Sequence, residues 1–169
     1  MQVYLETHQM SLEDLPLDEG YASEKIKAKD ILGEEVSFGG QNGKTQIIIS
    51  TPYLNQDNFE EFNSIFQDKD LEIEDVEKYL ILSSKEDVKV AFDMPVIIDN
   101  KEMFGDEFGV RISDAPLEGK LTKALFIISK DGAIFYEEIP SDLKTEFNVD
   151  KIYQKTMAAL ACYTGKGCH

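Results

Sequence analysis

The chain has 169 residues, 42% of them apolar, which is enough for one domain with a complete hydrophobic core. Its 33 acidic and 17 basic side chains give a formal net charge of −16. A negative field of this size repels nucleic acid and anionic membrane surfaces, so we exclude both as partners.

An N-terminal β-hairpin is the first predicted element, because apolar and polar residues alternate on both sides of residues 7–9. Its strands are expected near residues 3–5 and 10–12. The polar, turn-rich segment 16–40 follows, and we expect one short strand in it, around residues 35–38.

Apolar runs of strand length recur through the rest of the chain, and patterns of helical spacing lie between them. The strands are expected at 47–50, 79–83, 95–98, 124–129 and 134–139. The helices are expected at 59–66, 86–92 and 150–161. In the last helix we expect Met157 to face the core. The order strand, helix, strand, helix, hairpin, helix predicts a thioredoxin-like α/β fold, with a central mixed sheet and helices on both faces.

The N-terminus and the cysteine content both favour a cytoplasmic protein. Residues 1–6 contain neither the basic nor the apolar region of a secretion signal, and no run reaches the roughly 18 apolar residues of a membrane span. Both cysteines, Cys162 and Cys168, lie in the last eight residues, whereas a disulfide-built secreted domain distributes more of them through the chain.

A proline turn links the predicted strand that ends at Pro52 to the helix that follows it. Peroxiredoxins have the same succession of strand, proline turn and helix at their active site, where their motif is Pro-x-x-x-Thr-x-x-Cys. Counting from Pro52 places Gln56 at the threonine position and Phe59 at the cysteine position. Alignment of the helix on residues 61–63 instead shortens the catalytic turn by about four residues. In both alignments the nucleophilic cysteine is missing.

Two segments in the C-terminal half resemble one subfamily in particular. Residues 108–119, FGVRISDAPLEG, resemble the Y-G-V-x-I-x-D-G-P-L-x-G segment of the bacterial thiol peroxidases, a subfamily of the peroxiredoxins. Residues 121–128, LTKALFII, look like the L-x-A-R-A-V-F-V-I strand of that subfamily, which also has an N-terminal hairpin. The likeness covers residues 3–160 and implies the thioredoxin-like fold of peroxiredoxin type.

The resemblance also implies roles for the active-site positions. Peroxiredoxins use a cysteine thiolate to attack the peroxide O–O bond, a threonine to orient the peroxide, and an arginine to hold the thiolate and the charge on the leaving oxygen. Here Phe59 replaces the cysteine, or the cysteine is deleted, while Gln56 and Lys123 stand at the threonine and arginine positions. The family's resolving cysteine would fall at residues 92–94 and is also absent. Pro52, Gln56 and Lys123 remain as candidates for a vestigial pocket.

Each polar member of this set also has a structural interpretation. Lys123 fits a structural lysine at the start of a strand, which keeps the positive charge of an arginine but loses its planar fork. Gln56 fits a surface loop that caps the following helix equally well.

The tail, residues 162–169, extends past the usual end of the family and is treated as separate from the domain at 1–161. Cys162 and Cys168, with five residues between them, could close a disulfide across a glycine-containing loop. With His169 they could bind a soft metal, but a fourth ligand is missing and we expect no metal. An inert extension is the third alternative.

Two functions fit these observations. The first is a degenerate thiol peroxidase-like protein, a pseudoenzyme without a cofactor, that works as a binding or regulatory module. The second is a thiol-dependent oxidoreductase that uses Cys162 and Cys168, with a thioredoxin-type reductant as partner. The resemblance further implies a homodimer across the face that carries Pro52 and the loop 114–117, where we expect Pro116 and Leu117 to be exposed.

Overall fold

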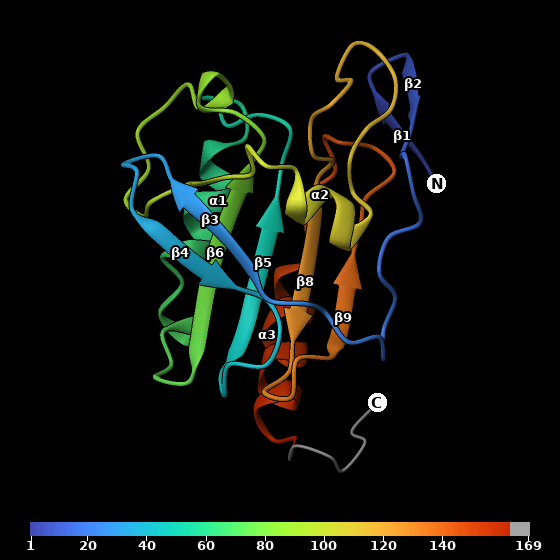
Figure 1. The fold of residues 1–169 in the computed structure, drawn as a ribbon. Coiled ribbons are helices and arrows are strands. Elements are labelled where there is room, and N and C mark those ends of the chain that lie inside the picture. The colour runs from blue at the N-terminus through green and yellow to red at the C-terminus, as the bar shows by residue number, and fades with distance from the viewer. Residues whose placement is uncertain (163–169) are drawn as a thin grey trace.

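A seven-stranded mixed sheet forms the centre of the computed structural model, in which residues 1–162 are described (Figure 1). The strand order is β4-β3-β7-β6-β5-β8-β9. The strands are β3 Ile26–Asp30, β4 Glu35–Phe38, β5 Thr45–Ser50, β6 Val76–Leu82, β7 Ile97–Ile98, β8 Ala124–Ile128 and β9 Ile134–Glu138. β6 pairs in parallel with β5 and β7, and the other neighbouring strands pair antiparallel.

Helices cover both faces of this sheet. They are α1 Phe59–Phe66, α2 Met103–Phe108 and α3 Val149–Leu160, with single 3-10 turns at η1 Lys69–Leu71 and η2 Lys85–Asp87. β5 shows the two faces most clearly, because successive side chains of a strand point to opposite sides. Ile47 and Ile49 pack in a hydrophobic cluster with α1 and α3, whereas Ile48 packs in a second cluster with α2. The predicted thioredoxin-like arrangement is therefore confirmed.

The N-terminal hairpin, β1 Gln2–Leu5 and β2 His8–Ser11, is present as predicted. It packs against the loop 114–117, because Leu117 lies in one hydrophobic cluster with side chains of both hairpin strands. Leu117 is consequently only 8% exposed. The expected exposure is therefore wrong for Leu117 and confirmed for Pro116, and Ala115 in the same loop is exposed as well.

The segment 16–40 contains two strands, not the single strand expected. β3 buries Ile26 and Asp30 and exposes Lys27 and Lys29, so it alternates as a half-buried strand does. The sequence signal is weak because three of its five residues are charged. β3 is a strand because it pairs with both β4 and β7, and the hydrophobic pattern of its own residues does not predict this pairing.

The helix expected at 86–92 does not form, and only the turn η2 lies at its start. Val88, Val90 and Phe92 alternate with exposed residues and pack against the core, which is the period of an extended chain. The helix α2, by contrast, was not expected, because its six residues are too few to show helical periodicity. In α3, Met157 is 40% exposed, so its predicted place in the core is wrong.

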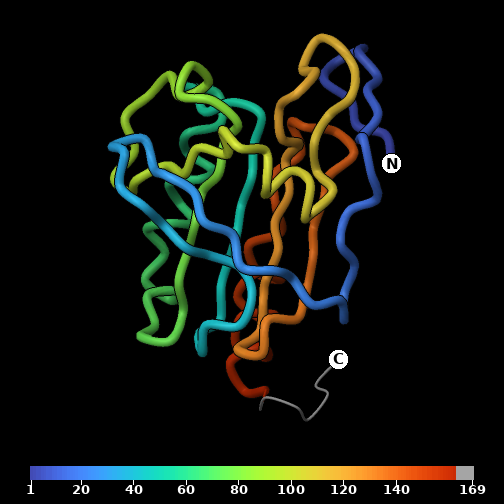
Figure 2. Tube along the Cα trace, in the orientation of Figure 1, coloured from blue at the N-terminus to red at the C-terminus, as the bar shows by residue number. Residues whose placement is uncertain are grey.

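The segment that joins the hairpin to β3 runs beside β9 before it crosses the sheet (Figure 2). The backbone N–H of Ile134 in β9 donates to the carbonyl of Tyr21 at 2.8 Å and fixes this segment at its end. Further back, the Leu15 carbonyl lies against Gly109, where an added Cβ atom would be 2.1 Å from that oxygen. Gly109 also has a φ of +70°, so both its conformation and its neighbour require glycine.

Replacing Gly109 with alanine is expected to lower the free energy of unfolding by more than about 3 kcal/mol, because backbone strain and a clash with the Leu15 carbonyl add together. Gly33→Ala is the matched control. Gly33 has a φ of +87° but no atom within 4 Å of an added Cβ, so roughly 1 to 2 kcal/mol of strain is expected there. Urea denaturation measures both, and equal losses would contradict the close approach at Gly109.

Candidate functional site

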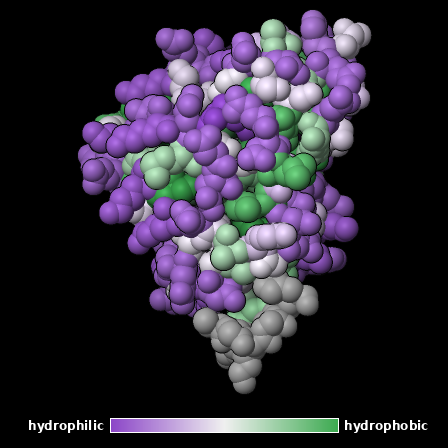
Figure 3. Space-filling model, turned by 45° about the vertical axis from the view of Figure 1, so that its right-hand side comes forward, coloured by the Kyte–Doolittle hydropathy of each residue, from purple (hydrophilic) through white to green (hydrophobic). Residues whose placement is uncertain are grey.

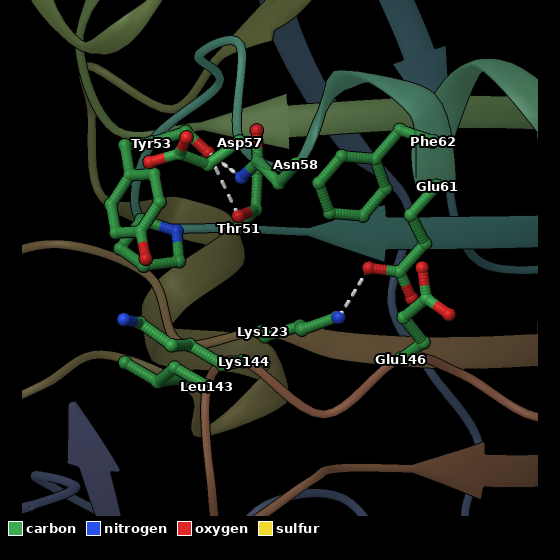
Figure 4. Close-up of a pocket in the computed structure, with 11 residues that line it drawn as sticks. Thr51, Tyr53, Asp57, Asn58, Glu61, Phe62, Lys123, Leu143, Lys144 and Glu146 are labelled. Atoms are coloured by element: carbon green, nitrogen blue, oxygen red, sulfur yellow. Dashed lines mark hydrogen bonds and ion pairs between the residues drawn. The ribbon is translucent and has the colours of Figure 1, made fainter. Parts of the chain in front are cut away.

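A cavity of about 550 Å³ lies at the carboxyl end of β5, between the start of α1 and the loops that precede β8 and α3 (Figure 4). We call it the Pro52 pocket. It is lined by Thr51, Pro52, Tyr53, Asp57, Asn58, Glu61, Phe62, Lys123, Leu143, Lys144 and Glu146. Its walls come from three segments that are far apart in the sequence, so the pocket exists only in the folded chain.

Side-chain hydrogen bonds hold the turn between β5 and α1. The Thr51 hydroxyl donates to the Tyr53 carbonyl at 2.9 Å, and the Asn58 amide donates to the same oxygen at 2.8 Å. The Asn58 side-chain oxygen accepts from the Asn55 N–H at 2.9 Å. Asn58, directly before α1, therefore closes this turn and fixes the residues that follow Pro52.

An ion pair between Lys123 and Glu61 forms the floor of the pocket. Lys123 Nζ lies 2.5 Å from Glu61 Oε1, and the two side chains are only 4% and 8% exposed. Lys123 Nζ also donates to the Thr145 carbonyl at 2.6 Å, while Glu61 Oε2 accepts from the Phe147 N–H at 2.6 Å. Because both buried charges have a partner of opposite sign and a further hydrogen bond, the pair is tolerated away from water.

Two aromatic rings complete the surroundings of the Lys123 ammonium. Its Nζ lies 4.8 Å from the centre of the Phe147 ring and 5.7 Å from that of Phe62, within the range of a cation–π interaction. The ammonium is thus held by a carboxylate, a carbonyl and two ring faces. Little of its charge is left to bind an anion in the pocket.

The structure brings together two of the three residues predicted for the pocket. Both Pro52, which follows β5, and Lys123, which directly precedes β8, line it. Gln56 is exposed and lies outside the lining. Phe59, at the predicted cysteine position, also lies outside the lining and packs on Phe92 with ring centres 6.1 Å apart, edge to face.

The contact between Phe59 and Phe92 joins the two places that the resemblance assigns to the family's cysteines. Phe92 also meets Phe66 edge to face at 5.4 Å, so the ring is packed from two turns of α1. These contacts hold the first turn of α1 against the extended segment after η2. An apolar interface therefore lies between the two positions.

Glu61 is the functional residue that the sequence did not reveal. It stands three residues after Asn58, the position of the glutamate in a helix capping box, so it reads as an ordinary residue of a helix start. In the structure the Asn58 side chain makes no capping bond to α1, and Glu61 turns toward Lys123 instead. No spacing within the chain indicates that interaction, because 62 residues separate the partners.

Tyr53 and Lys144 form the outer rim of the pocket. Partial burial raises the pKa of the Tyr53 hydroxyl, an effect that the nearby Lys144 opposes, so the hydroxyl stays protonated. Lys144 Nζ lies 2.9 Å from Glu6 Oε1, with both side chains more than half exposed. A pair so open to water contributes little to stability, and its lysine can exchange partners.

Cys162, the cysteine that lies within the described residues, is not among the residues that line this pocket. Cys162 follows α3 and is half-buried, and its N–H donates to the Ala159 carbonyl at 3.1 Å. Cys168 and His169 lie outside the described residues, so the predicted tail chemistry remains a prediction. Within residues 1–162, no three His, Cys, Asp or Glu side chains are grouped as metal ligands.

The sheet order, the two helical layers and the proline turn beside a buried cation define a thioredoxin-like protein of peroxiredoxin type. Solved structures agree on the fold. A peroxiredoxin-like protein from Aquifex aeolicus superposes with a TM-score of 0.79 over 94% of this chain and 97% of its own, at 21% identity. Thiol peroxidase from Chromobacterium violaceum superposes with a TM-score of 0.72 over 90% of this chain and 93% of its own, at 12% identity.

Proteins similar in sequence identify the subfamily within the peroxiredoxins. Thiol peroxidase from Campylobacter jejuni is 31% identical over 165 residues, which cover 85% of this chain and 84% of that protein. No family model matches the chain. On the strength of this relative, the chain belongs to the thiol peroxidase family of the peroxiredoxins. None of the helices in residues 1–162 has the length and apolar character needed to span a bilayer.

Replacing Glu61 with glutamine is expected to lower the free energy of unfolding by about 3 kcal/mol or more, because the buried Lys123 ammonium loses its counter-charge. The double variant Glu61→Gln, Lys123→Met removes both charges and is expected to recover much of this loss. Urea denaturation at pH 7 gives the comparison.

Glu6→Gln is the matched control, since it removes the acid of the exposed pair with Lys144 and is expected to leave the free energy of unfolding almost unchanged. If Glu61→Gln costs no more than Glu6→Gln, the buried pair does not carry the stability assigned to it.

Proposed function

We propose that this member of the thiol peroxidase family does not reduce peroxides at the Pro52 pocket and uses it as a binding or regulatory site. One observation carries the proposal. The lysine at the family's arginine position is neutralised by Glu61, while residues 1–161 contain no cysteine. The cation that would hold a thiolate is engaged with a carboxylate.

The chemistry of the family supports this reading. Peroxide reduction begins when a thiolate attacks the O–O bond, forming a sulfenic acid and releasing water or an alcohol. None of the hydroxyl, amide, carboxylate and ammonium groups that line the pocket replaces a thiolate as the acceptor of oxygen. Removing the nucleophile removes the covalent route itself, so the loss is far larger than a shift in affinity.

The pocket nevertheless keeps the means to bind a small polar molecule. Tyr53, Asp57 and Lys144 offer a hydroxyl, a carboxylate and an ammonium group at its rim, next to the apolar surface of Pro52 and Leu143. A few polar groups that converge on a partly apolar cavity are typical of ligand sites.

The alternative is a thiol-dependent oxidoreductase that uses Cys162 and Cys168 with a thioredoxin-type reductant. Cys162 follows the C-terminus of α3, where the negative end of the helix dipole disfavours a thiolate. This geometry makes Cys162 a slow nucleophile and supports the first proposal over the second. Both proposals assume a reducing cytoplasm, which the position of the two cysteines favours.

Peroxide consumption with a thioredoxin-type reductant is expected to be absent or very weak in the wild type, because the Pro52 pocket has no cysteine to act as the nucleophile. The same assay on the double variant Cys162→Ser, Cys168→Ser separates the two functions. Turnover that disappears in the double variant supports the oxidoreductase. If the double variant still consumes peroxide at a rate near that of an ordinary thiol peroxidase, the proposal for the Pro52 pocket is wrong.

A homodimer across the face of the Pro52 pocket is the second part of the proposal. Tyr53 from the pocket and Leu117 from the loop 114–117 pack in one cluster, so the two surfaces are continuous. The net charge of −16 opposes association, so the dimer is expected to tighten as salt screens the repulsion.

Sedimentation of the wild type is expected to show a dimer at moderate salt. Ala115→Lys is expected to weaken it by placing a charge in the interface, whereas Ala158→Lys, an equal change on the exposed face of α3, is expected to leave it intact. A pure monomer at high protein concentration rules out the dimer.

A further inference from the structure

A second hollow, of about 560 Å³, lies between the segment 13–21 and β9. We call it the β9 hollow. It is lined by Met1, Leu15, Pro16, Leu17, Asp18, Tyr21, Glu137 and Ile139, and it shares no lining residue with the Pro52 pocket. Figure 3 brings this side of the molecule forward and shows apolar surface there, bordered by hydrophilic residues.

The apolar side chains around the β9 hollow are exposed to an unusual degree. Leu15 is 78% exposed, Tyr21 63% and Met1 43%. Single exposed apolar residues are ordinary, but several around one depression indicate a surface that another molecule covers.

The backbone holds these side chains outward. The Glu13 N–H donates to the Arg111 carbonyl at 2.8 Å, and the Leu17 N–H donates to the Phe108 carbonyl at 3.1 Å. Leu15 lies between these two anchors. Its exposure is therefore built into the fold, and binding at the hollow requires little further ordering of this segment.

The polar residues of the hollow are acidic. Asp18 and Glu137 line it, and Glu19 stands beside them. The described residues that line it include no lysine, arginine or histidine, and the positive group among them is the terminal ammonium of Met1. Glu137 Oε2 is buried and accepts no hydrogen bond from a donor group of the described residues, and the polar group beside the Glu137 carboxyl is the side chain of Asp18, itself an acid. Burial, then the charge of Asp18 and a side-chain hydrogen bond shared with it, and last the charge of Glu19, raise the pKa of Glu137 to about 7. A donor of positive charge would satisfy this oxygen and relieve the repulsion among the carboxylates.

A second copy of the chain does not meet this need. In a two-fold dimer the same patch lies on both sides, so Asp18, Glu19 and Glu137 of one copy would face those of the other. Charge complementarity requires a basic partner.

We propose that the β9 hollow binds a segment of another protein in which apolar side chains are flanked by lysine or arginine. The apolar side chains fill the space between Leu15, Leu17 and Ile139, and a flanking cation bonds to the carboxylate of Glu137. The site is independent of the Pro52 pocket and of its proposed function.

Calorimetric titration with the peptide acetyl-Lys-Leu-Lys-Leu-Lys-Leu-Lys-amide tests the proposal at pH 8, where Glu137 is ionised. The wild type is expected to bind this peptide and not the same peptide with glutamate in place of lysine. Leu15→Ser is expected to weaken binding roughly tenfold through lost apolar contact. Glu137→Gln is expected to weaken binding and to flatten its dependence on salt.

Leu32→Ser is the matched control, because Leu32 is 76% exposed in the turn between β3 and β4 and does not line the hollow. It is expected to leave binding unchanged, and thermal unfolding confirms that each variant is folded. The proposal is overturned if the lysine peptide does not bind, if Leu15→Ser and Leu32→Ser act alike, or if the glutamate peptide binds as well. It is also overturned if the wild type forms dimers that Leu15→Ser abolishes, since a second copy then covers the hollow.

Discussion

The buried ion pair between Lys123 and Glu61 is the interaction on which the geometry of this domain depends most. It joins the start of β8 to α1, and its further hydrogen bonds reach Thr145 and Phe147 in the loop before α3. Three elements from distant parts of the chain are thereby held around one pair of charges. A buried pair is stable only with this full set of partners, so the surrounding loops have little freedom to move independently.

The same pair determines what the Pro52 pocket can do. A cation left free at this place would attract anions and lower the pKa of a nearby thiol. A cation paired with a carboxylate and covered by two aromatic rings presents the pocket with almost no net charge from its floor. The character of the pocket then comes from its rim, where Asp57 and Lys144 are exposed and Tyr53 is half-buried. Family membership fixes the architecture, and these side chains decide the chemistry.

Much of the fold could be predicted from the sequence, because the strands of the central sheet are nearly continuous apolar runs. β5 and β8 are buried along their whole length, and such runs are visible without any partner. β3 could not be recognised with the same ease, since pairing with two neighbours, not apolar content, makes it a strand. The helix predicted at 86–92 is wrong because Val88 and Phe92 fit a helical spacing and an extended alternation equally well.

The candidate site was predicted less completely, for a different physical reason. Lys123 could be found because a strand motif fixes its place, and strands tolerate few insertions. Counting from Pro52 to Gln56 and Phe59 assumes instead that the turn has a constant length, and turns vary in length. Asn58 closes the turn early, so Phe59 lies outside the pocket lining and packs on Phe92. Glu61 could not be found at all, since its role depends on a contact across 62 residues.

The contact between Phe59 and Phe92 depends on different conditions from a bond between two cysteines. An edge-to-face ring pair contributes about 0.5 to 1.5 kcal/mol and forms or breaks with temperature and denaturant alone. A bond between two sulfurs at the same places would form or break with the supply of electrons. Thiol oxidation therefore cannot make or break this contact between the first turn of α1 and the segment after η2.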